Sequence, residues 1–270
     1  MDNLDRVLIT GANGLIGSEL DFGIKMSHAD LDITNSDSIR SAIEKYNPNA
    51  ILNLSSLNLR ASQKEPVLAN NVNVLGVYNL AVESKRKDIP LIIISSGAVF
   101  NGNLNQEFYE EDIPNPQNTY GQTKYMAEII ARTVNDKSII IRTGWLFGFR
   151  KKENFFNKML ESTKKSSDLT VTYDQTGSFT YINDFVDSLK EIIKEEKYGV
   201  YHVTNKEKAT ALDLSLELTS FLKSKSKINK ISISESEKEG IIRSRSEVLV
   251  SKKIQLRSWK SALEEYLSEV

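Results

Sequence analysis

The stretch Arg6–Gly17 reads RVLITGANGLIG, and it decides the fold. A short aliphatic run ends at Thr10, and glycines follow at positions 11, 14 and 17. A glycine-rich turn that follows a buried strand and opens a helix is typical of a βαβ unit that holds a dinucleotide. We expect Gly11 to allow the tight turn, Gly14 to let the backbone approach a pyrophosphate, and residue 17 to allow close helix–strand packing. Amides at the helix start would bind the phosphates.

Short apolar runs alternate with helical segments through the rest of the first half of the chain. Runs that favour strands lie at 50–54, 90–95 and 138–142, and helices are predicted at 36–46, 66–84 and 119–133. Strands that are apolar at every position are buried on both faces, so helices must cover both faces of a parallel sheet. The sequence therefore predicts an α/β protein with a doubly wound, parallel-sheet Rossmann fold.

The alternation of apolar runs with helical segments becomes less regular after Gly148. Strands are predicted at 169–173 and 199–204, and helices at 183–195 and 211–222. We expect a dinucleotide-binding Rossmann domain over residues 1–148. Residues 149–270 are expected to form mainly a small α/β substrate-binding lobe, with a segment at about 178–198 returning to the first domain. The two parts would be interleaved rather than independent.

Composition excludes several kinds of chemistry. The 270 residues contain no cysteine, which excludes disulfides, thiolate zinc sites and cysteine nucleophiles. They contain two histidines, His28 and His202. The net charge of −1 gives no overall attraction to nucleic acids or anionic membranes. No apolar run approaches the ~18 residues that cross a membrane, and the acidic N-terminus is unlike a secretory signal. We expect a cytoplasmic protein that binds neither nucleic acid nor membrane.

A second group of residues predicts acid–base chemistry. Tyr120 and Lys124 lie four positions apart on a predicted helix, so they share one face, about 5–6 Å apart at Cβ. We expect the ammonium to lower the pKa of the phenol and to contact a nicotinamide ribose. Ser95 and Ser96 end a buried strand at the edge where open α/β sheets bind ligands. A serine there could hydrogen-bond a substrate carbonyl while Tyr120 transfers a proton.

Several stretches together resemble a known family. The glycine loop, the strand-end serine and YxxxK occur in the order used by the extended short-chain dehydrogenase/reductase superfamily. Longer stretches resemble dTDP-4-dehydrorhamnose reductase, and they read NLSS at 53–56, SSGAVFNG at 95–102, NTYGQTKYMAE at 118–128, RTGWLFG at 142–148 and GVYH at 199–202. The resemblance implies hydride transfer from NAD(P)H to C4 of a nucleotide-linked 4-keto-6-deoxy sugar, in the biosynthesis of deoxysugars such as dTDP-rhamnose and of polysaccharides.

The resemblance also implies roles for individual residues. Ser96 falls where the family has a catalytic threonine, Tyr120 would donate the proton, and Lys124 would be its electrostatic partner. Substrate contacts are expected from Ser96, Trp145 and Asn154. Cofactor contacts are expected from Gly11, Asn13, Gly14, Leu15, Ile16 and Gly17, from Asp32 and Ile33 at the adenine, from Leu54, Ser55 and Ser56 beneath the cofactor, and from Tyr120 and Lys124.

The choice of cofactor depends on the end of the second predicted strand, which reads KMSH at residues 25–28. No acid lies there to accept the adenosine ribose hydroxyls, and Asp30 or Asp32 is the nearest one. Lys25 or His28 could instead face a 2′-phosphate, so we expect NADPH (NADP) rather than NAD. The sequence contains no metal cluster, although Mg²⁺ held by scattered carboxylates would leave no signature. A homodimer is expected by analogy only.

Departures from the family pattern lie on the substrate side and leave the sugar open. Gly97 and Ala98 replace the family's Asp-Tyr. Arg60, Lys64 and Arg243 are candidates for the nucleotide diphosphate, although each also fits an ordinary surface charge.

Two alternatives to the reductase also stay open. A nucleotide-sugar epimerase needs only the same Ser/Tyr/Lys set, and a non-catalytic NADP-binding regulatory subunit could keep the fold. A 4,6-dehydratase is disfavoured, because it needs an acid and a base beside the strand-end hydroxyl and residues 97–98 supply neither.

Overall fold

The aliphatic runs form one parallel sheet in the computed structural model, which describes residues 3–149, 154–236 and 240–270. Neighbouring strands follow the order β10-β6-β4-β3-β1-β2, and every pair is parallel. The strand order reverses between β1 and β3, as it does in doubly wound folds. The strands are β1 (Val7–Thr10), β2 (Ile24–Met26), β3 (Ala50–Asn53), β4 (Leu91–Ser96), β6 (Ser138–Thr143) and β10 (Gly199–Val203).

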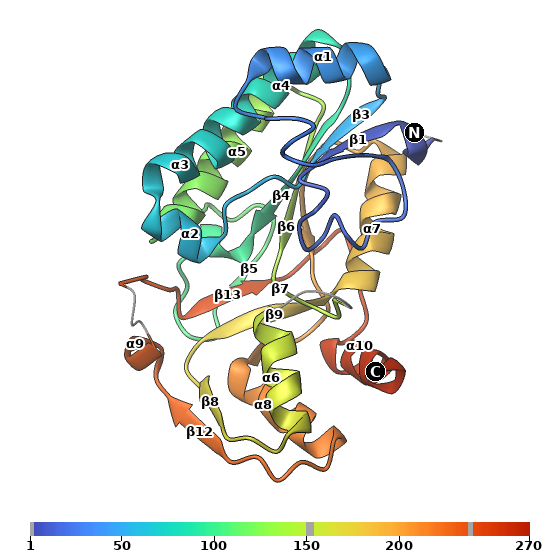
Figure 1. Cartoon of the computed structure of the whole chain (residues 1–270). Coiled ribbons are helices and arrows are strands. Elements are labelled where there is room, and N and C mark those ends of the chain that lie inside the picture. The colour runs from blue at the N-terminus through green and yellow to red at the C-terminus, as the bar shows by residue number, and fades with distance from the viewer. Residues whose placement is uncertain (1–2, 150–153, 237–239) are drawn as a thin grey trace.

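Helices cover both faces of this sheet (Figure 1). On one face, Leu8 of β1 packs in a core with α1 (Ser36–Tyr46), α4 (Gly76–Arg86) and α5 (Thr119–Val134). On the other face, Val7 and Ile9 pack in a core with α7 (Ile182–Glu195). Alternate residues of one strand thus enter two separate cores, and the predicted doubly wound α/β fold is confirmed.

The helix predicted at 66–84 contains an irregular turn. It begins as α3 (Pro66–Asn70), passes through a π-helical turn at Asn71–Leu75 and continues as α4. The short helix α2 (Leu59–Lys64) precedes it. Single π turns inside α-helices occur often at functional sites, and this one contains Asn73, whose contacts are described below.

The helix expected after the glycine loop does not form. Between β1 and β2 the structure contains only turns, closed by hydrogen bonds such as Gly14 N to Gly11 O at 2.9 Å and Ser18 N to Gly14 O at 3.1 Å. Residues 11–23 return the chain to a parallel neighbour, with little more than the dozen residues that such a crossover needs at least. Leu20 and Phe22 are buried in the core beside α7, where a regular helix would otherwise lie.

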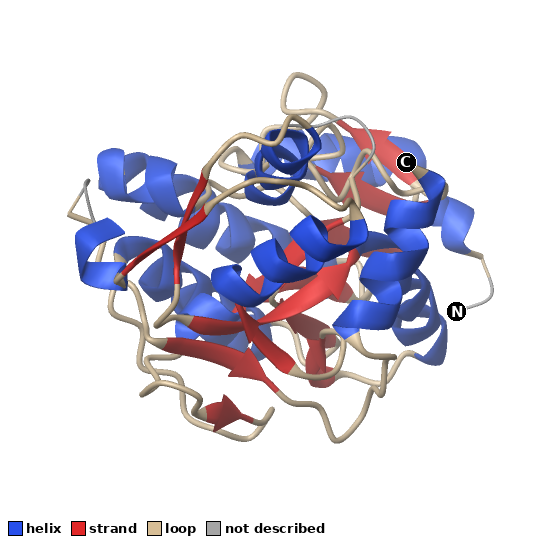
Figure 2. Ribbon diagram, turned by 90° about the horizontal axis from the view of Figure 1, so that it is seen from below, coloured by secondary structure: helices blue, strands red, loops and turns tan. Residues whose placement is uncertain are grey.

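The second part of the molecule is a smaller α/β lobe below the main sheet (Figure 1). Its larger sheet has the order β11-β9-β13-β5, and one more strand, β7, pairs with β9. Figure 2 shows strands at the centre of the molecule and helices around them. The strands of this sheet are β5 (Glu107–Phe108), β7 (Trp145–Phe147), β9 (Thr176–Tyr181), β11 (Lys208–Thr210) and β13 (Ser246–Leu249).

Within the described residues, a two-stranded sheet and four helices complete the lobe. Strand β8 (Leu169–Thr172) pairs in parallel with β12 (Ile228–Ile231). Because β5 and β13 are adjacent although they are far apart in the chain, the lobe is built from several separate segments. Its helices are α6 (Phe155–Lys164), α8 (Ala211–Phe221), α9 (Ile233–Ser236) and α10 (Trp259–Glu269). Of the helices in the described ranges, none has the length and apolar character needed to cross a membrane.

Candidate active site

The ends of β1 and β3 are joined at the point where the strand order reverses. Thr10 Oγ1 lies 2.6 Å from Asn53 Oδ1, and Ser55 binds both residues at 3.1 Å. Gly11 has φ of 65°, and a Cβ there would lie 2.6 Å from Ser55 N. Only glycine fits this backbone conformation and this close contact. The glycine loop and the 54–56 segment therefore lie side by side at the edge where open α/β sheets bind ligands.

The predicted cofactor residues divide between exposed and buried positions. Asn13, Gly14 and Leu15 are exposed at the tip of the loop, whereas residue 17 is buried against Ala12. Ile16 is half-buried and packs against the core beside α7. The loop therefore presents its tip to solvent at the sheet edge.

The predicted adenine side of the site lies after β2. The Asp32 carboxylate accepts hydrogen bonds from Thr34 N and Oγ1, at 2.9 and 2.8 Å, and these bonds lower its pKa. Ile33 is buried against Gly76 of α4. Lys25 and His28 are both exposed at this edge. Two basic side chains therefore lie beside the position expected for the adenosine ribose.

Ser96 and Tyr120 form a pair beside the end of β4. Asn118 caps the N-terminus of α5 by accepting the Gly121 N–H at 2.9 Å, and the helix then presents Tyr120 to Ser96, with which it hydrogen-bonds. Ser95, in contrast, donates to Glu128 farther along the same helix. The structure thus places Ser96 rather than Ser95 beside the phenol, in agreement with the position chosen from the motif.

Burial controls the protonation of Tyr120 and Lys124. Burial raises the pKa of Tyr120 to about 12, although the hydrogen bond from Ser96 acts in the opposite direction. Burial also lowers the pKa of Lys124 to about 8, partly offset by the charge of Glu128. The expectation that the ammonium would lower the pKa of the phenol is wrong in this structure, because desolvation dominates. At neutral pH the phenol therefore carries its proton.

A buried ion pair holds α5 against the sheet. Arg142 on β6 donates to Glu128 through Nη2 at 2.7 Å and Nε at 3.0 Å, and both side chains are 3% exposed. Arg142 Nη1 lies 3.3 Å from His202 Nε2 on β10. Burial and the Arg142 charge lower the pKa of His202 to about 4, so this ring is neutral. The network joins three strands of the main sheet to the helix that carries Tyr120 and Lys124.

Asn73 was not identified from the sequence, yet it connects two parts of the site. Its Oδ1 accepts the Leu57 N–H at 2.8 Å, and its Nδ2 donates to Thr123 Oγ1 at 3.0 Å. It therefore ties the segment after β3 to α5 beside Lys124. No sequence signal points to it, because an asparagine inside a predicted helix is indistinguishable from an ordinary polar residue.

The substrate side contains Trp145 and a residue that the sequence did not reveal, Glu247. Trp145 lies on β7, packed edge-on against Phe179 with ring centroids 5.3 Å apart, and its indole N–H donates to the Glu247 carboxylate. Glu247 is close enough to Tyr120 to raise the pKa of the phenol. Asn154, the other predicted substrate residue, caps α6 by accepting Asn157 N–H at 2.8 Å.

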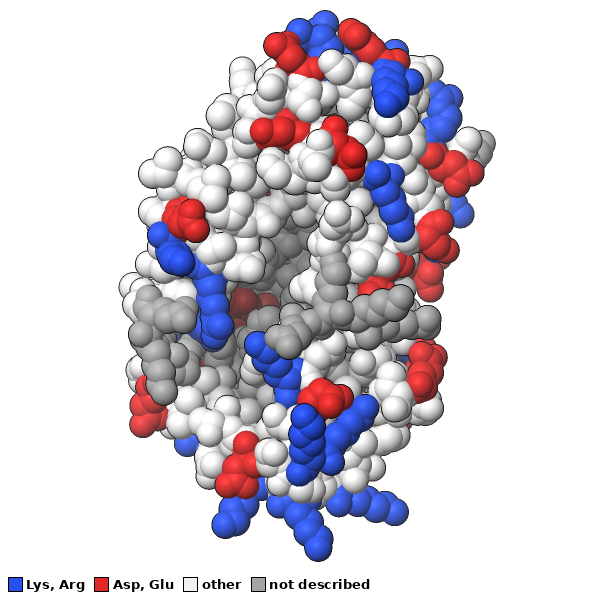
Figure 3. All heavy atoms as spheres, in the orientation of Figure 1, with Lys and Arg blue, Asp and Glu red and all other residues white. Residues whose placement is uncertain are grey.

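The three predicted phosphate candidates differ in exposure. Arg60 and Lys64 are exposed on α2, and Arg243 is half-buried shortly before β13. Figure 3 shows a hollow between the two parts of the molecule, in the region that β13 crosses in Figure 1, with acidic atoms in its depth. In the part of the chain that the structure describes, no three His, Cys, Asp or Glu side chains are grouped to hold a metal ion.

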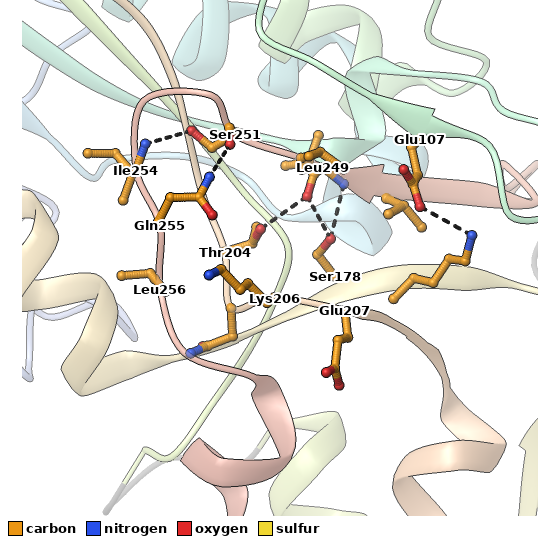
Figure 4. Close-up of a pocket in the computed structure, with 14 residues that line it drawn as sticks. Glu107, Ser178, Thr204, Lys206, Glu207, Leu249, Ser251, Ile254, Gln255 and Leu256 are labelled. Atoms are coloured by element: carbon orange, nitrogen blue, oxygen red, sulfur yellow. Dashed lines mark hydrogen bonds and ion pairs between the residues drawn. The ribbon is translucent and has the colours of Figure 1, made fainter.

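A separate small cavity of about 110 Å³ lies on another side of β13 (Figure 4). Ser178, Leu249, Thr204 and Ser251 line it, and hydrogen bonds join the first two. None of the predicted catalytic or cofactor residues borders it. We therefore assign the chemistry to the edge of the main sheet and not to this cavity.

Comparison with known proteins identifies the family. A family model described as the RmlD substrate binding domain matches residues 5–270. The chain belongs to this family. It is 34% identical to dTDP-4-dehydrorhamnose reductase of Aggregatibacter actinomycetemcomitans, over 79% of this chain and 78% of that protein. It is 31% identical to the spore coat polysaccharide biosynthesis protein SpsK of Bacillus subtilis, over 75% and 74%.

Solved structures of the family agree with this fold. The structure of dTDP-4-dehydrorhamnose reductase from Bacillus anthracis, in complex with NADP, is 28% identical and has a TM-score of 0.92. The match covers 98% of this chain and 99% of that chain. The resemblance inferred from the sequence motifs is therefore confirmed along nearly the whole chain.

Proposed function

We propose that this protein is a reductase that uses NADPH to reduce the C4 ketone of a dTDP-linked 4-keto-6-deoxy sugar in deoxysugar biosynthesis. The observation that carries the proposal is the Ser96–Tyr120 pair beside Lys124, with the phenol protonated at neutral pH. A protonated phenol is the form that a reduction requires, because the alkoxide formed at C4 must receive a proton. The names of the relatives point to the same class of substrate.

The roles of the side chains follow from their contacts. NADPH, when bound, supplies the hydride. Ser96 holds the substrate carbonyl oxygen by a hydrogen bond and so stabilises the negative charge that develops on it. Tyr120 donates its proton to that oxygen. Lys124, one helical turn away, keeps a positive charge near the phenol at neutral pH, which stabilises the phenolate left after the transfer.

The choice of NADPH over NADH is supported by the charges after β2. Lys25 and His28 are exposed there, while the carboxylates of Asp30 and Asp32 accept hydrogen bonds from Ser27 and Thr34. Both basic side chains are exposed and accessible to a 2′-phosphate, with Lys25 also donating to the Leu20 carbonyl oxygen. The NADP bound by the Bacillus anthracis relative also supports this choice. We expect Lys25→Ala to raise the KM for NADPH and to leave the KM for NADH unchanged.

The direct test follows NADPH oxidation at 340 nm with 4-keto-6-deoxy sugars linked to dTDP, UDP or GDP. The dTDP sugar should give the fastest loss of absorbance. Tyr120→Phe should lower kcat by orders of magnitude with NADPH binding retained, and Tyr173→Phe, an exposed tyrosine, should leave kcat unchanged. Absence of NADPH oxidation with every sugar would overturn the proposal, as would near-normal turnover by Tyr120→Phe.

We also propose that the protein forms a homodimer through an apolar flank. The exposed fractions are between 41% and 74% for Val67 of α3, Leu75 of the π-helical turn, Tyr78 of α4, and Met126 and Ile129 of α5. Exposed apolar groups that cluster on adjoining helices mark association surfaces. Light scattering should give the mass of a dimer, and Met126→Glu should shift it toward the monomer. A monomeric wild-type protein at micromolar concentration would contradict this proposal.

A further inference from the structure

Glu247 reaches the end of the catalytic strand from the other part of the molecule. It lies on β13, opposite Gly177 of β9, far along the chain from Ser96. A Cβ placed on Gly97 would lie 2.8 Å from the carbonyl oxygen of Glu247 and 3.2 Å from its Cβ. The two backbones therefore touch, and a side chain at position 97 would require the backbone at Glu247 to shift.

This contact gives a physical meaning to one departure from the family pattern. The pattern has an aspartate at position 97, directly after the catalytic hydroxyl, and this chain has glycine there. Glu247 fills the space beside that glycine. A carboxyl-bearing residue thus remains next to the end of β4, but β13 supplies it in place of residue 97.

The side chain of Glu247 is held in place and is partly accessible. Trp145 donates its indole N–H to the carboxylate, and the indole itself lies against Gly177, where a Cβ would be 2.8 Å from the ring. Glu247 is half-buried. The charged and titratable groups that face it are Tyr120 on α5 and Arg243 in the segment before β13. A fixed, partly desolvated carboxylate near Tyr120, the partner of Ser96, is well placed to accept a hydrogen bond from a ligand.

The chemistry of the substrate shows which group this carboxylate would meet. In a 4-keto-6-deoxy sugar, C4 has two ring neighbours, C3 and C5. C5 carries a methyl group, whereas C3 carries a hydroxyl. With the ketone oxygen at Ser96 and Tyr120, the C3 hydroxyl is the only donor on a carbon adjacent to the reacting one.

On the basis of the proposed function, we propose that Glu247 accepts a hydrogen bond from the C3 hydroxyl of the sugar and thereby determines which sugars the enzyme reduces. Glu247 is then a specificity residue of the substrate cleft, and it takes no part in the proton transfer at C4. A hydrogen bond to a charged group contributes enough to change binding about 10- to 100-fold.

The test compares the dTDP-linked 4-keto-6-deoxy sugar with its 3-deoxy analogue. The wild-type kcat/KM should be about 10- to 100-fold higher for the parent sugar. Glu247→Gln and Glu247→Ser should raise the KM for the parent sugar by a similar factor, change kcat only a few-fold, and remove the preference. Glu217→Gln, an exposed glutamate on α8, should keep wild-type values for both sugars. A preference that survives in both Glu247 variants would overturn the proposal.

The pH dependence provides a readout that a purely structural residue would not affect. Burial raises the pKa of Glu247 to about 7, so the carboxylate form increases as the pH rises through 7. The wild-type KM for the parent sugar should therefore fall between pH 6 and 8, and the KM of Glu247→Gln should stay constant there. A wild-type KM that rises or stays flat over this range would contradict the inference.

A binding experiment separates this inference from the proposed function. The affinity of a dTDP-6-deoxy sugar with a free C3 hydroxyl is measured by calorimetry for the wild type and for Glu247→Gln. If the wild type reduces no keto sugar but its affinity falls about 10-fold or more in the variant, the reductase proposal fails and the role of Glu247 stands. Equal affinities in the two proteins would overturn the role of Glu247, whatever the turnover.

Discussion

Replacing Glu128 by glutamine should destabilise the protein more than any change to an exposed ion pair. Glu128 is bound to Arg142 by two hydrogen bonds of 2.7 and 3.0 Å, and both side chains are 3% exposed. Removing one partner leaves a buried, uncompensated guanidinium, which costs about 3–5 kcal/mol. An unfolding entropy of about 2.1 cal/mol/K per residue converts this loss to roughly 5–9 °C in Tm for a chain of this size.

Urea unfolding, followed by circular dichroism, measures this effect. Arg142→Met should lose a similar amount, because it leaves Glu128 charged and buried. The double variant Glu128→Met/Arg142→Met should be clearly more stable than the sum of the single losses predicts, because it leaves no buried charge. Lys260→Met, which breaks an exposed pair with Glu217, should cost less than about 1 kcal/mol. Losses below 1 kcal/mol in both single variants, or additive losses in the double variant, would refute the reasoning.

Three further predictions concern the cofactor loop, the lysine and the core. Gly11→Ala should abolish NADPH binding in a fluorescence titration, because its Cβ would lie 2.6 Å from Ser55 N; Gly240→Ala, with a similar φ of 66° but no atom within 4 Å, should bind normally. Burial lowers the pKa of Lys124 to about 8, so the kcat should fall as the pH rises through about 8 and the ammonium loses its proton. A kcat that stays constant up to pH 9.5 would contradict this prediction. Trp259→Ala should lower the free energy of unfolding by about 3–5 kcal/mol in urea, since the ring is 1% exposed and packs 5.2 Å from Phe179.

The strands of the main sheet could be predicted because they carry a strong local signal. The runs at 50–54 and 138–142 are almost entirely apolar, and such runs are buried on both faces of a parallel sheet. The helix 36–46 was predicted with the bounds that it has, because its apolar stripe stops before Asn47. This residue adopts a left-handed conformation directly after the helix. The prediction of a helix after the glycine loop was wrong: because only residues 18–26 separate Gly17 from the end of the second strand, a truncated helix was expected, and the structure contains turns in its place.

Sequence motifs could place the candidate site residues that share a helix face or that end a strand of the main sheet. Tyr120 and Lys124 share a helix face, and Ser96 ends the neighbouring strand, so spacing and strand order were enough. The protonation of Tyr120 depends on burial, which no motif reports. Glu247 could not be found, because its position depends on the pairing of β13 with β9 and on the contact with Gly97.

The contact between Gly97 and Glu247 also bears on how the protein is made. The glycine loop and YxxxK helix leave the ribosome early, whereas residue 247 is added 150 residues after residue 97. At about 5–20 residues per second, this delay is roughly 8–30 s. For most of this time a nascent chain contains the dinucleotide loop and Tyr120, the proposed proton donor, but lacks the carboxylate of β13. A chain that stops before β13 would therefore contain the proton-transfer residues without the residue that we assign to sugar selection.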